Sequence, residues 1–314
     1  MFEYIKNNLK SDFSSKVRWR IRMVRDVTYA VLQDKYAVKA FADSKGVSSP
    51  ETLFVTNNPN EIPFDNLPDK YFIKANNGCA WNIYFESGVF YKFGHGENLV
   101  SDDGFIRGAD AAERLILTQP EVVSLCANWL EKKYSQLEWA YSMIKPLIVV
   151  EECLEGAGKL PLVDHRFYVF DGVVKAVNLG SSYYRKHNIN LFLDRDWNQI
   201  PMETRSFNLP DTIPVKPGCF SEMVSSAERL AEGYDFLRVD LYNTTKGVML
   251  GEITLYPDGG GRNRPSGCRS FDEALGKYWR VSNMQSVAVF GWNLLSFSKL
   301  TLFCITRRIK RLFS

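Results

Sequence analysis

The chain has 314 residues, of which 45% are hydrophobic and 24% are charged, a balance typical of a protein with an ordinary folded core. This length suits one large domain or two to three small ones. The formal net charge of +3 is too small to indicate a nucleic-acid-binding protein by itself. Six cysteines occur without a CxxC pair, and the first residues lack the pattern of a secretory signal. We therefore expect reduced thiols in a cytoplasmic protein.

Several common catalytic motifs are absent from the sequence. The three histidines, His95, His165 and His187, are too scattered for a histidine-based zinc site. There is no P-loop, no GxGxxG fingerprint and no GxSxG nucleophile elbow. If the chain is an enzyme, carboxylates, lysines and backbone groups must bind its metal ions and phosphates.

The predicted elements mix helices with hairpins, which indicates an α+β fold. In chain order they are a basic helical segment at 1–33, a helix at 35–44, a strand at 51–55, a hairpin of 71–74 with 82–85, helical spacing over 111–142, a strand at 147–150, a hairpin of 166–170 with 173–178, a helix at 221–234 and a hairpin of 236–242 with 248–255. We divide the chain into a basic N-terminal segment (1–33), a first lobe (34–150), a second lobe with a metal site (151–280) and an apolar, basic tail (281–314).

The last hairpin carries the most informative side chains. If Tyr242 faces Val248, four side chains project from one face of the sheet: Arg238, Asp240, Glu252 and Thr254. Asp240 and Glu252 are then diagonal neighbours with Cβ atoms roughly 7–8 Å apart, a gap that one Mg²⁺ ion can span. A shift of one residue in the register would separate the two carboxylates. The alternative is that both are solvated on an exposed sheet face, with Arg238 as their ion-pair partner.

Two further segments could bind a nucleotide. Lys74 ends an apolar strand before a loop of small residues, where its charge can neutralise phosphate and the N–H groups around Gly78 can add hydrogen bonds. The apolar strand at 147–150 runs into Glu151 and Glu152, which suggests a hinge between lobes whose backbone pairs with an adenine edge. The alternatives are a strand-end lysine that reaches into solvent and a solvated strand end.

Taken in order, these segments resemble the ATP-grasp superfamily and, more narrowly, the TupA-like ATP-grasp family, which is linked to teichuronopeptide and surface-polysaccharide biosynthesis. The resemblance covers roughly residues 30–280. The motifs that carry it are Asp34-Lys35, Phe72-Ile73-Lys74, Val150-Glu151-Glu152-Cys153-Leu154, Asp164-His165-Arg166-Phe167, Arg238-Val239-Asp240-Leu241-Tyr242, Gly251-Glu252-Ile253-Thr254 and Leu255-Tyr256-Pro257-Asp258-Gly259-Gly260-Gly261.

The resemblance implies an α+β ATP-grasp fold whose two lobes clasp Mg-ATP between antiparallel sheets. It assigns nucleotide binding to Lys35, Lys74, Glu151, Glu152, Leu154 and Arg166. It assigns Mg²⁺ to Asp240, Glu252 and Thr254, and catalysis to Lys74 and to Arg238, which would stabilise the transferring phosphoryl group. Two positions depart from the family pattern: Asn77-Gly78-Cys79-Ala80 replaces His-Gly-Ser-Gly, and Thr254 replaces an asparagine, a better Mg²⁺ ligand.

The activity implied by the resemblance is that of a carboxylate–amine ligase acting through an acyl phosphate. An amino acid would be joined to a uronic acid of a surface polysaccharide or its precursor, in capsule or cell-envelope assembly. Basic residues that could hold an anionic glycan are Arg185, Lys186 and Arg262–Arg264, although they also suit a solvated loop. The alternatives are a glycosyltransferase and a non-catalytic glycan-binding protein. We expect no nucleic-acid partner.

The C-terminal tail combines an apolar stretch with a basic end. Ser286–Ile305 is largely apolar but contains Asn293 and Lys299, and four basic residues follow it: Arg307, Arg308, Lys310 and Arg311. This composition favours a helix that lies peripherally on the inner face of the membrane. The alternative is a terminal helix packed on the core or on a second subunit.

Overall fold

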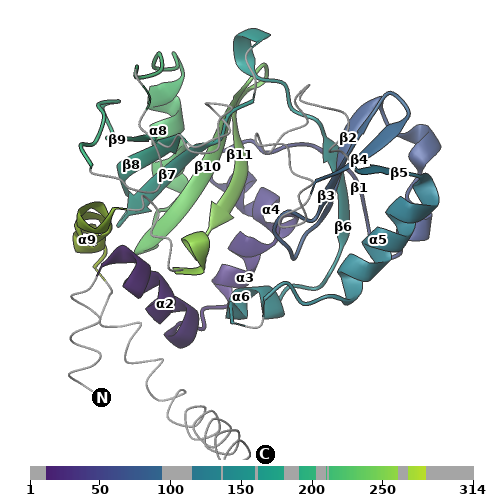
Figure 1. Cartoon of the computed structure of the whole chain (residues 1–314), viewed down its shortest axis with the longest axis horizontal. Helices are drawn as coiled ribbons and strands as arrows, with labels where there is room; N and C mark the ends of the chain where they lie inside the picture. Colours follow the sequence, from purple (N-terminus) through teal and green to yellow (C-terminus); the bar gives the residue numbers. More distant parts are fainter. Residues whose placement is uncertain are drawn as a thin grey trace, which may run out of the picture.

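The computed structural model describes residues 12–93, 115–135, 137–159, 162–179, 191–202, 210, 212–260 and 268–280. It contains two antiparallel sheets, with helices between and around them (Figure 1). Every strand pair in both sheets is antiparallel, as the predicted α+β class requires. The calls on Arg185, Lys186, Arg262–Arg264 and the tail at 281–314 lie outside the described residues.

The first sheet has six strands in the order β1-β6-β2-β3-β4-β5. Their bounds are β1 (Thr52–Thr56), β2 (Lys70–Ala75), β3 (Asn82–Glu86), β4 (Val89–Phe93), β5 (Leu115–Leu117) and β6 (Ile148–Glu152). The side chains of Tyr71, Ile73 and Ala75 alternate along β2 and are all buried, which is the pattern of a strand with one face against a core. The predicted hairpin of 71–74 with 82–85 is confirmed as β2 and β3.

The helical spacing predicted over 111–142 is wrong in part, because it begins with a strand in the described region. Leu115–Leu117 pairs with β4 as edge strand β5, and helix α5 (Gln119–Glu131) starts only after it. The start is set by a capping box in which the Thr118 backbone N–H and hydroxyl both donate to Glu121 at 2.7 Å. Helix α5 then covers the sheet with Val122, Cys126 and Trp129, which lie on one helical face.

The second sheet has five strands in the order β11-β10-β7-β8-β9. Their bounds are β7 (His165–Phe170), β8 (Val173–Leu179), β9 (Leu191–Leu193), β10 (Phe236–Thr244) and β11 (Gly247–Thr254). The predicted turn at Asp171-Gly172 is confirmed, and both residues have the positive φ that a tight hairpin needs, 47° and 75°. Helix α8 (Phe220–Leu230) packs on this sheet and turns six residues into the core: Phe220, Met223, Val224, Ser226, Ala227 and Leu230.

The remaining helices belong to the core of the second sheet or lie beside it. They are α2 (Phe13–Met23), α3 (Thr28–Gln33), α4 (Ala37–Ser44), α6 (Trp139–Ser142) and α9 (Arg269–Tyr278). Short 3₁₀ turns occur at η1 (Pro59–Glu61) and η2 (Phe64–Asn66), beside the core of the first sheet, and at η4 (Ala157–Lys159) and η5 (Pro257–Gly260). The fully buried Arg20 of α2 pairs with Asp235 at 2.5 Å, and the indole N–H of Trp279 donates to the same carboxylate at 2.8 Å. Helix α2 is thereby fixed to the second sheet.

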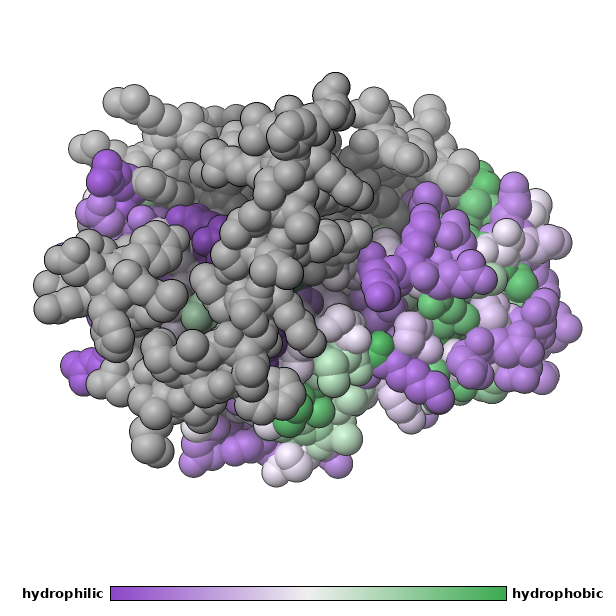
Figure 2. Space-filling view, turned by 90° about the horizontal axis from the view of Figure 1, so that it is seen from below, coloured by the Kyte–Doolittle hydropathy of each residue, from purple (hydrophilic) through white to green (hydrophobic). Residues whose placement is uncertain are grey.

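Viewed from below, the coloured surface over the first sheet is mainly hydrophilic, with small hydrophobic patches between the polar residues (Figure 2). This agrees with the inward orientation of the large apolar side chains of both sheets. Among the described residues, no helix combines the length and apolar character needed to cross a bilayer.

Candidate functional site

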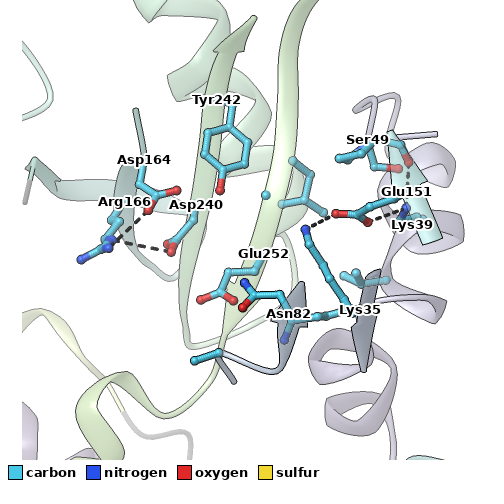
Figure 3. A pocket seen from close by; sticks show the side chains of 16 residues that line it. Lys35, Lys39, Ser49, Asn82, Glu151, Asp164, Arg166, Asp240, Tyr242 and Glu252 are labelled. Carbon is cyan, nitrogen blue, oxygen red and sulfur yellow. Dashed lines mark hydrogen bonds and ion pairs between the residues drawn. The ribbon is translucent and has the colours of Figure 1, made fainter. Parts of the chain in front are cut away.

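A cavity of about 190 Å³ lies between the two sheets. Figure 3 shows Asp164, Arg166, Asp240, Tyr242 and Glu252 on one side of it, facing Lys35, Lys39 and Glu151 on the other. An adjoining cavity of about 210 Å³ shares several of these residues and extends to Phe72, Glu152, Leu154 and Leu162. The structure therefore brings together, around one cleft, all but two of the predicted site residues. Arg238 and Thr254 line neither cavity, although Arg238 contacts residues that do.

The two carboxylates of the last hairpin share one face, but the register that brings them together differs from the predicted one. Tyr242 pairs with Met249 rather than Val248, so the loop end of the hairpin is shifted by one residue. A β-bulge between Asp240 and Leu241 shifts the register by one further residue, and Asp240 lies directly opposite Glu252 instead of diagonally. Two shifts of one residue move each side chain to a new partner but leave it on the same face, so both carboxylates still face the cleft.

Gly251 is the extra residue of this bulge, and the packing around it excludes a side chain. A Cβ atom at this position would lie 2.6 Å from the ring of Tyr242 and 3.2 Å from the carbonyl oxygen of Asp240. Gly251 thus allows Tyr242 to lie across the bulge beside the carboxylate pair.

We expect Gly251→Ala to destabilise the fold by about 1–3 kcal/mol through overpacking and to displace the carboxylate pair. Thermal unfolding with and without Mg²⁺ and ATP would show a lower Tm and a smaller ligand-induced rise. The matched control is Gly218→Ala, because a Cβ atom there meets nothing within 4 Å. Equal behaviour of the two variants would contradict the role of the bulge.

Arg238 neutralises the carboxylate pair in this structure. Its guanidinium donates to both oxygens of Asp240 at 2.8 and 2.7 Å and to Glu252 at 2.9 Å. Burial raises the pKa of Asp240 to about 6, against the opposing charge of Arg238. Burial would also raise the pKa of Glu252, but the positive charges of Lys35 and Arg238 outweigh it and hold that pKa below its usual value. The predicted ion pair with Arg238 therefore forms, with the Asp240 side chain buried and the Glu252 side chain 40% exposed at the cleft.

Two lysines hold the carboxylate of Glu151. Lys74 contacts one oxygen of this carboxylate, and Lys39 contacts the other at 3.0 Å. The Lys39 ammonium also donates to the carbonyl oxygen of Pro50 at 2.8 Å, which fixes its position at the rim. Lys39 was not assigned a role from the sequence, although it lies four residues from Lys35 on one face of the helix predicted at 35–44.

The loop between β2 and β3 is anchored to the start of α4. Lys35 donates from its ammonium to the carbonyl of Gly78 at 2.5 Å and from its backbone N–H to the carbonyl of Asn76 at 3.1 Å. The Asp34 carboxylate accepts from the backbone N–H groups of Tyr36 and Ala37 at the start of α4 and from the Asn76 amide at 3.0 Å. A Cβ at Gly78 would lie 2.4 Å from the Trp81 ring, so only glycine fits there. The charge of Lys35 is thus held at the loop beside the cleft.

Two polar atoms at the cleft, Arg166 Nε and Asn82 Oδ1, are buried without a hydrogen bond. Arg166 pairs with Asp164 at 3.3 Å, but its Nε is buried without a hydrogen bond and lies 3.9 Å from Asp240. Asn82 Oδ1, on β3 opposite Lys74, is also buried without a partner. Buried polar atoms are normally satisfied, so a polar ligand in the cleft would complete them. Neither Asp164 nor Asn82 was assigned a role from the sequence.

The predicted hinge residues, Glu152 and Leu154, lie along the adjoining cavity. The Glu152 backbone N–H donates to the Glu51 carbonyl at 3.0 Å, and its carboxylate contacts Lys246. Leu154 lines the adjoining cavity.

Thr254, the predicted third metal ligand, lies opposite Arg238, and its hydroxyl donates to Glu252 at 3.1 Å. In the described part of the chain no three His, Cys, Asp or Glu side chains form a metal-binding group, so Asp240 and Glu252 would share a cation with phosphate and water.

The described side chains that line the first cavity balance in charge, with four cations and four carboxylates.

A model of the TupA-like ATP-grasp family matches residues 114–280, more than half of the chain. The chain belongs to the TupA-like ATP-grasp family. This confirms the resemblance and the predicted ATP-grasp class of the fold.

Solved structures similar to this ATP-grasp protein share little sequence with it. The ATP-grasp ligase PsnB, in complex with a phosphomimetic variant of a minimal precursor, Mg and ADP, is 13% identical with a TM-score of 0.41, over 81% of this chain and 59% of that chain. The D-alanine–D-alanine ligase of Helicobacter pylori is 12% identical with a TM-score of 0.43, over 80% and 62%. That of Bacillus anthracis, complexed with ATP, is 12% identical with a TM-score of 0.36, over 72% and 54%. The chain spans less than two thirds of the length of each. No curated protein matches the sequence.

Proposed function

We propose that this ATP-grasp protein is an ATP-dependent ligase that joins a carboxylate to an amine through an acyl phosphate. The observation that carries the proposal is the direct pairing of Asp240 with Glu252 in the cavity that Lys35, Lys74 and Arg166 also line. Phosphoryl transfer of this kind depends on positioning and charge neutralisation rather than on a side-chain nucleophile. The absence of nucleophilic catalytic motifs from the sequence agrees with such a reaction.

The cleft offers complementary places for the parts of Mg-ATP. Lys35, Lys74 and Arg166 would neutralise the phosphates, and the backbone of Glu152 and Leu154, with the side chain of Glu151, would bind the adenine in the adjoining cavity. Asp240 and Glu252 would hold Mg²⁺, which draws charge from the phosphate oxygens when bound. Thr254 would then support Glu252 through its hydroxyl rather than bind the ion itself.

Arg238 has two tasks in this scheme. Without a cation it pairs with both Asp240 and Glu252. With Mg²⁺ held by the two carboxylates, the Arg238 guanidinium would be available to stabilise the transferring phosphoryl group, because its planar donors suit phosphate oxygens. The finer proposal, an amino acid joined to a uronic acid of a surface polysaccharide by a cytoplasmic enzyme with a peripheral membrane contact, is supported by the family resemblance and the composition of 281–314.

The nucleotide separates this function from its alternatives. We expect Mg-ATP at a hundredfold excess over its Kd to stabilise the full-length protein by about 2.7 kcal/mol, seen as a rise in Tm, and EDTA to remove most of that rise. ADP release should then depend on a carboxylate and an amine together. Stabilisation by a UDP-sugar but not by Mg-ATP would instead identify a glycosyltransferase, and glycan binding without either nucleotide would identify a non-catalytic protein.

A further inference from the structure

Two lysines contact the buried carboxylate of Glu151, and they approach it from opposite sides. Glu151 lies on β6, which runs between β1 and β2, and its side chain is only 6% exposed. Lys39 reaches this carboxylate from α4, as Figure 3 shows, and pairs with Oε2 at 3.0 Å. Lys74 reaches it from the neighbouring strand β2 and contacts Oε1. Each oxygen of Glu151 therefore has a lysine of its own.

The ammonium of Lys39 is fully engaged by the protein. It has three N–H donors, and three acceptors surround it: the carbonyl oxygen of Pro50 at 2.8 Å, the hydroxyl of Thr52 at 3.0 Å and Oε2 of Glu151 at 3.0 Å. Thr52 lies directly opposite Glu151 in the pairing of β1 with β6. Lys39 thus joins α4 to both strands, and it has no donor left for a phosphate although it lines the first cavity.

Lys74 is held less firmly than Lys39. Within the described residues its ammonium has one hydrogen-bond partner, Glu151, and otherwise lies over the ring of Phe72, 5.2 Å from the centroid. Its side chain is 25% exposed, against 14% for Lys39, and it lines both cavities. Lys74 is therefore the lysine that can leave Glu151 for the phosphates of a bound nucleotide.

The departure of Lys74 would leave Glu151 with Lys39 as its partner. Burial by itself raises the pKa of Glu151, and the charges of Lys74 and Lys39 outweigh it and hold that pKa below its usual value. A buried carboxylate that lost every nearby cation would be neutralised by a proton. With Lys39 in place, Oε2 stays fixed while Oε1 becomes free to accept a hydrogen bond.

We propose that Lys39 is a positioning residue that holds Glu151 so that the free oxygen accepts from the amino group of adenine, and that Lys39 thereby sets the preference for adenine nucleotides. This inference rests on the proposed function and adds the residue on which base selection depends. A purine with a carbonyl in place of the amino group, as in guanine, presents an acceptor to the carboxylate and is repelled. A site built to hydrogen-bond an amino group also discriminates against a base that lacks one.

Nucleotide binding to the full-length protein tests this role. The Kd values of ATP and of purine riboside triphosphate, which lacks only the amino group, are measured by calorimetry with Mg²⁺. We expect the wild type to bind ATP at least about tenfold more tightly than purine riboside triphosphate. Lys39→Met should remove most of this preference by weakening the binding of ATP, while the affinity for purine riboside triphosphate changes less than about twofold. Lys39→Arg should restore part of the preference.

Two further variants make the test independent of any one substitution. Lys39→Gln keeps a donor but not the charge, and it should lose the preference as Lys39→Met does. Lys45→Met is the matched control, because Lys45 follows the same helix and pairs at 2.8 Å with the exposed carboxylate of Glu232. It should bind both nucleotides as the wild type does.

The inference is overturned if the folded Lys39 variants lose affinity for both nucleotides by the same factor, since that would show a general effect of charge or packing. It is also overturned if these variants keep the preference, or if the wild type binds the two nucleotides equally. A wild type with no affinity for Mg-ATP would instead contradict the proposed function itself.

Discussion

Glu252→Gln is expected to lower Mg-dependent ATP turnover at least about 100-fold while the protein stays folded. The amide keeps the shape of the side chain but removes the charge that would hold Mg²⁺ opposite Asp240. Because the Glu252 side chain is 40% exposed, the lost ion pair with Arg238 should cost little stability. ADP release measured over a range of Mg²⁺ concentrations, together with Tm, checks both parts.

Asp240→Asn should cause the same loss of turnover but with a measurable loss of stability. Its side chain is only 4% exposed and is held by both donors of Arg238, whose charge is left partly unpaired in the variant. Glu222→Gln, an exposed carboxylate of α8, is the control for a general effect of charge removal. Wild-type turnover in both site variants would refute the metal assignment.

Asp235→Ala is expected to have the largest effect on stability, a loss of about 3–5 kcal/mol in the free energy of unfolding. The substitution leaves the fully buried guanidinium of Arg20 without its carboxylate and the indole N–H of Trp279 without its acceptor. In a protein of this size the loss corresponds to a fall in Tm of about 10 °C, measurable by calorimetry.

The matched control for Asp235→Ala is an ion pair with the opposite exposure. Arg269 and Glu273 pair at 2.8 Å on the surface of α9, with side chains 77% and 49% exposed. Glu273→Ala should therefore change the free energy of unfolding by less than about 1 kcal/mol. If the two substitutions cost the same, the attachment of α2 to the second sheet does not depend on the buried pair.

The elements that sequence reasoning predicted correctly are those with strong local signals. The hairpin around Asp171-Gly172 has a turn that suits positive φ, and the apolar run before Glu151, rich in β-branched residues, forms the predicted buried strand. Leu115–Leu117 was misassigned because three apolar residues fit either a helix or a strand. The capping box at Thr118 was the local signal that marked the true start of the helix.

The carboxylate pair was predicted on one face for a reason that was only half right. Nothing in the spacing of Asp240 and Glu252 reveals the bulge, and counting residues from the turn places Tyr242 opposite the wrong partner. Gly251 was the one hint, because an isolated glycine in a strand often marks a bulge. The spacing therefore predicted the shared face of the two carboxylates correctly but not the residues that pair across the hairpin.

Other parts of the site depend on contacts that are distant in sequence. Lys39 meets Glu151 across 112 positions, and Lys35 meets the carbonyl of Gly78 across 43. No periodicity in the sequence encodes such meetings. They arise from packing of the two sheets and the helices between them, which only the folded chain displays.

The central claim is that Asp240 and Glu252 hold a divalent cation beside a nucleotide in the cleft between the sheets. Crystals grown with Mn²⁺ and a non-hydrolysable ATP analogue test it most directly, since the anomalous signal of manganese locates the ion without reference to any assay. We expect a manganese peak within coordination distance of both carboxylates, with the phosphates near Lys74 and Arg166. A nucleotide bound with its manganese away from this pair would contradict the account.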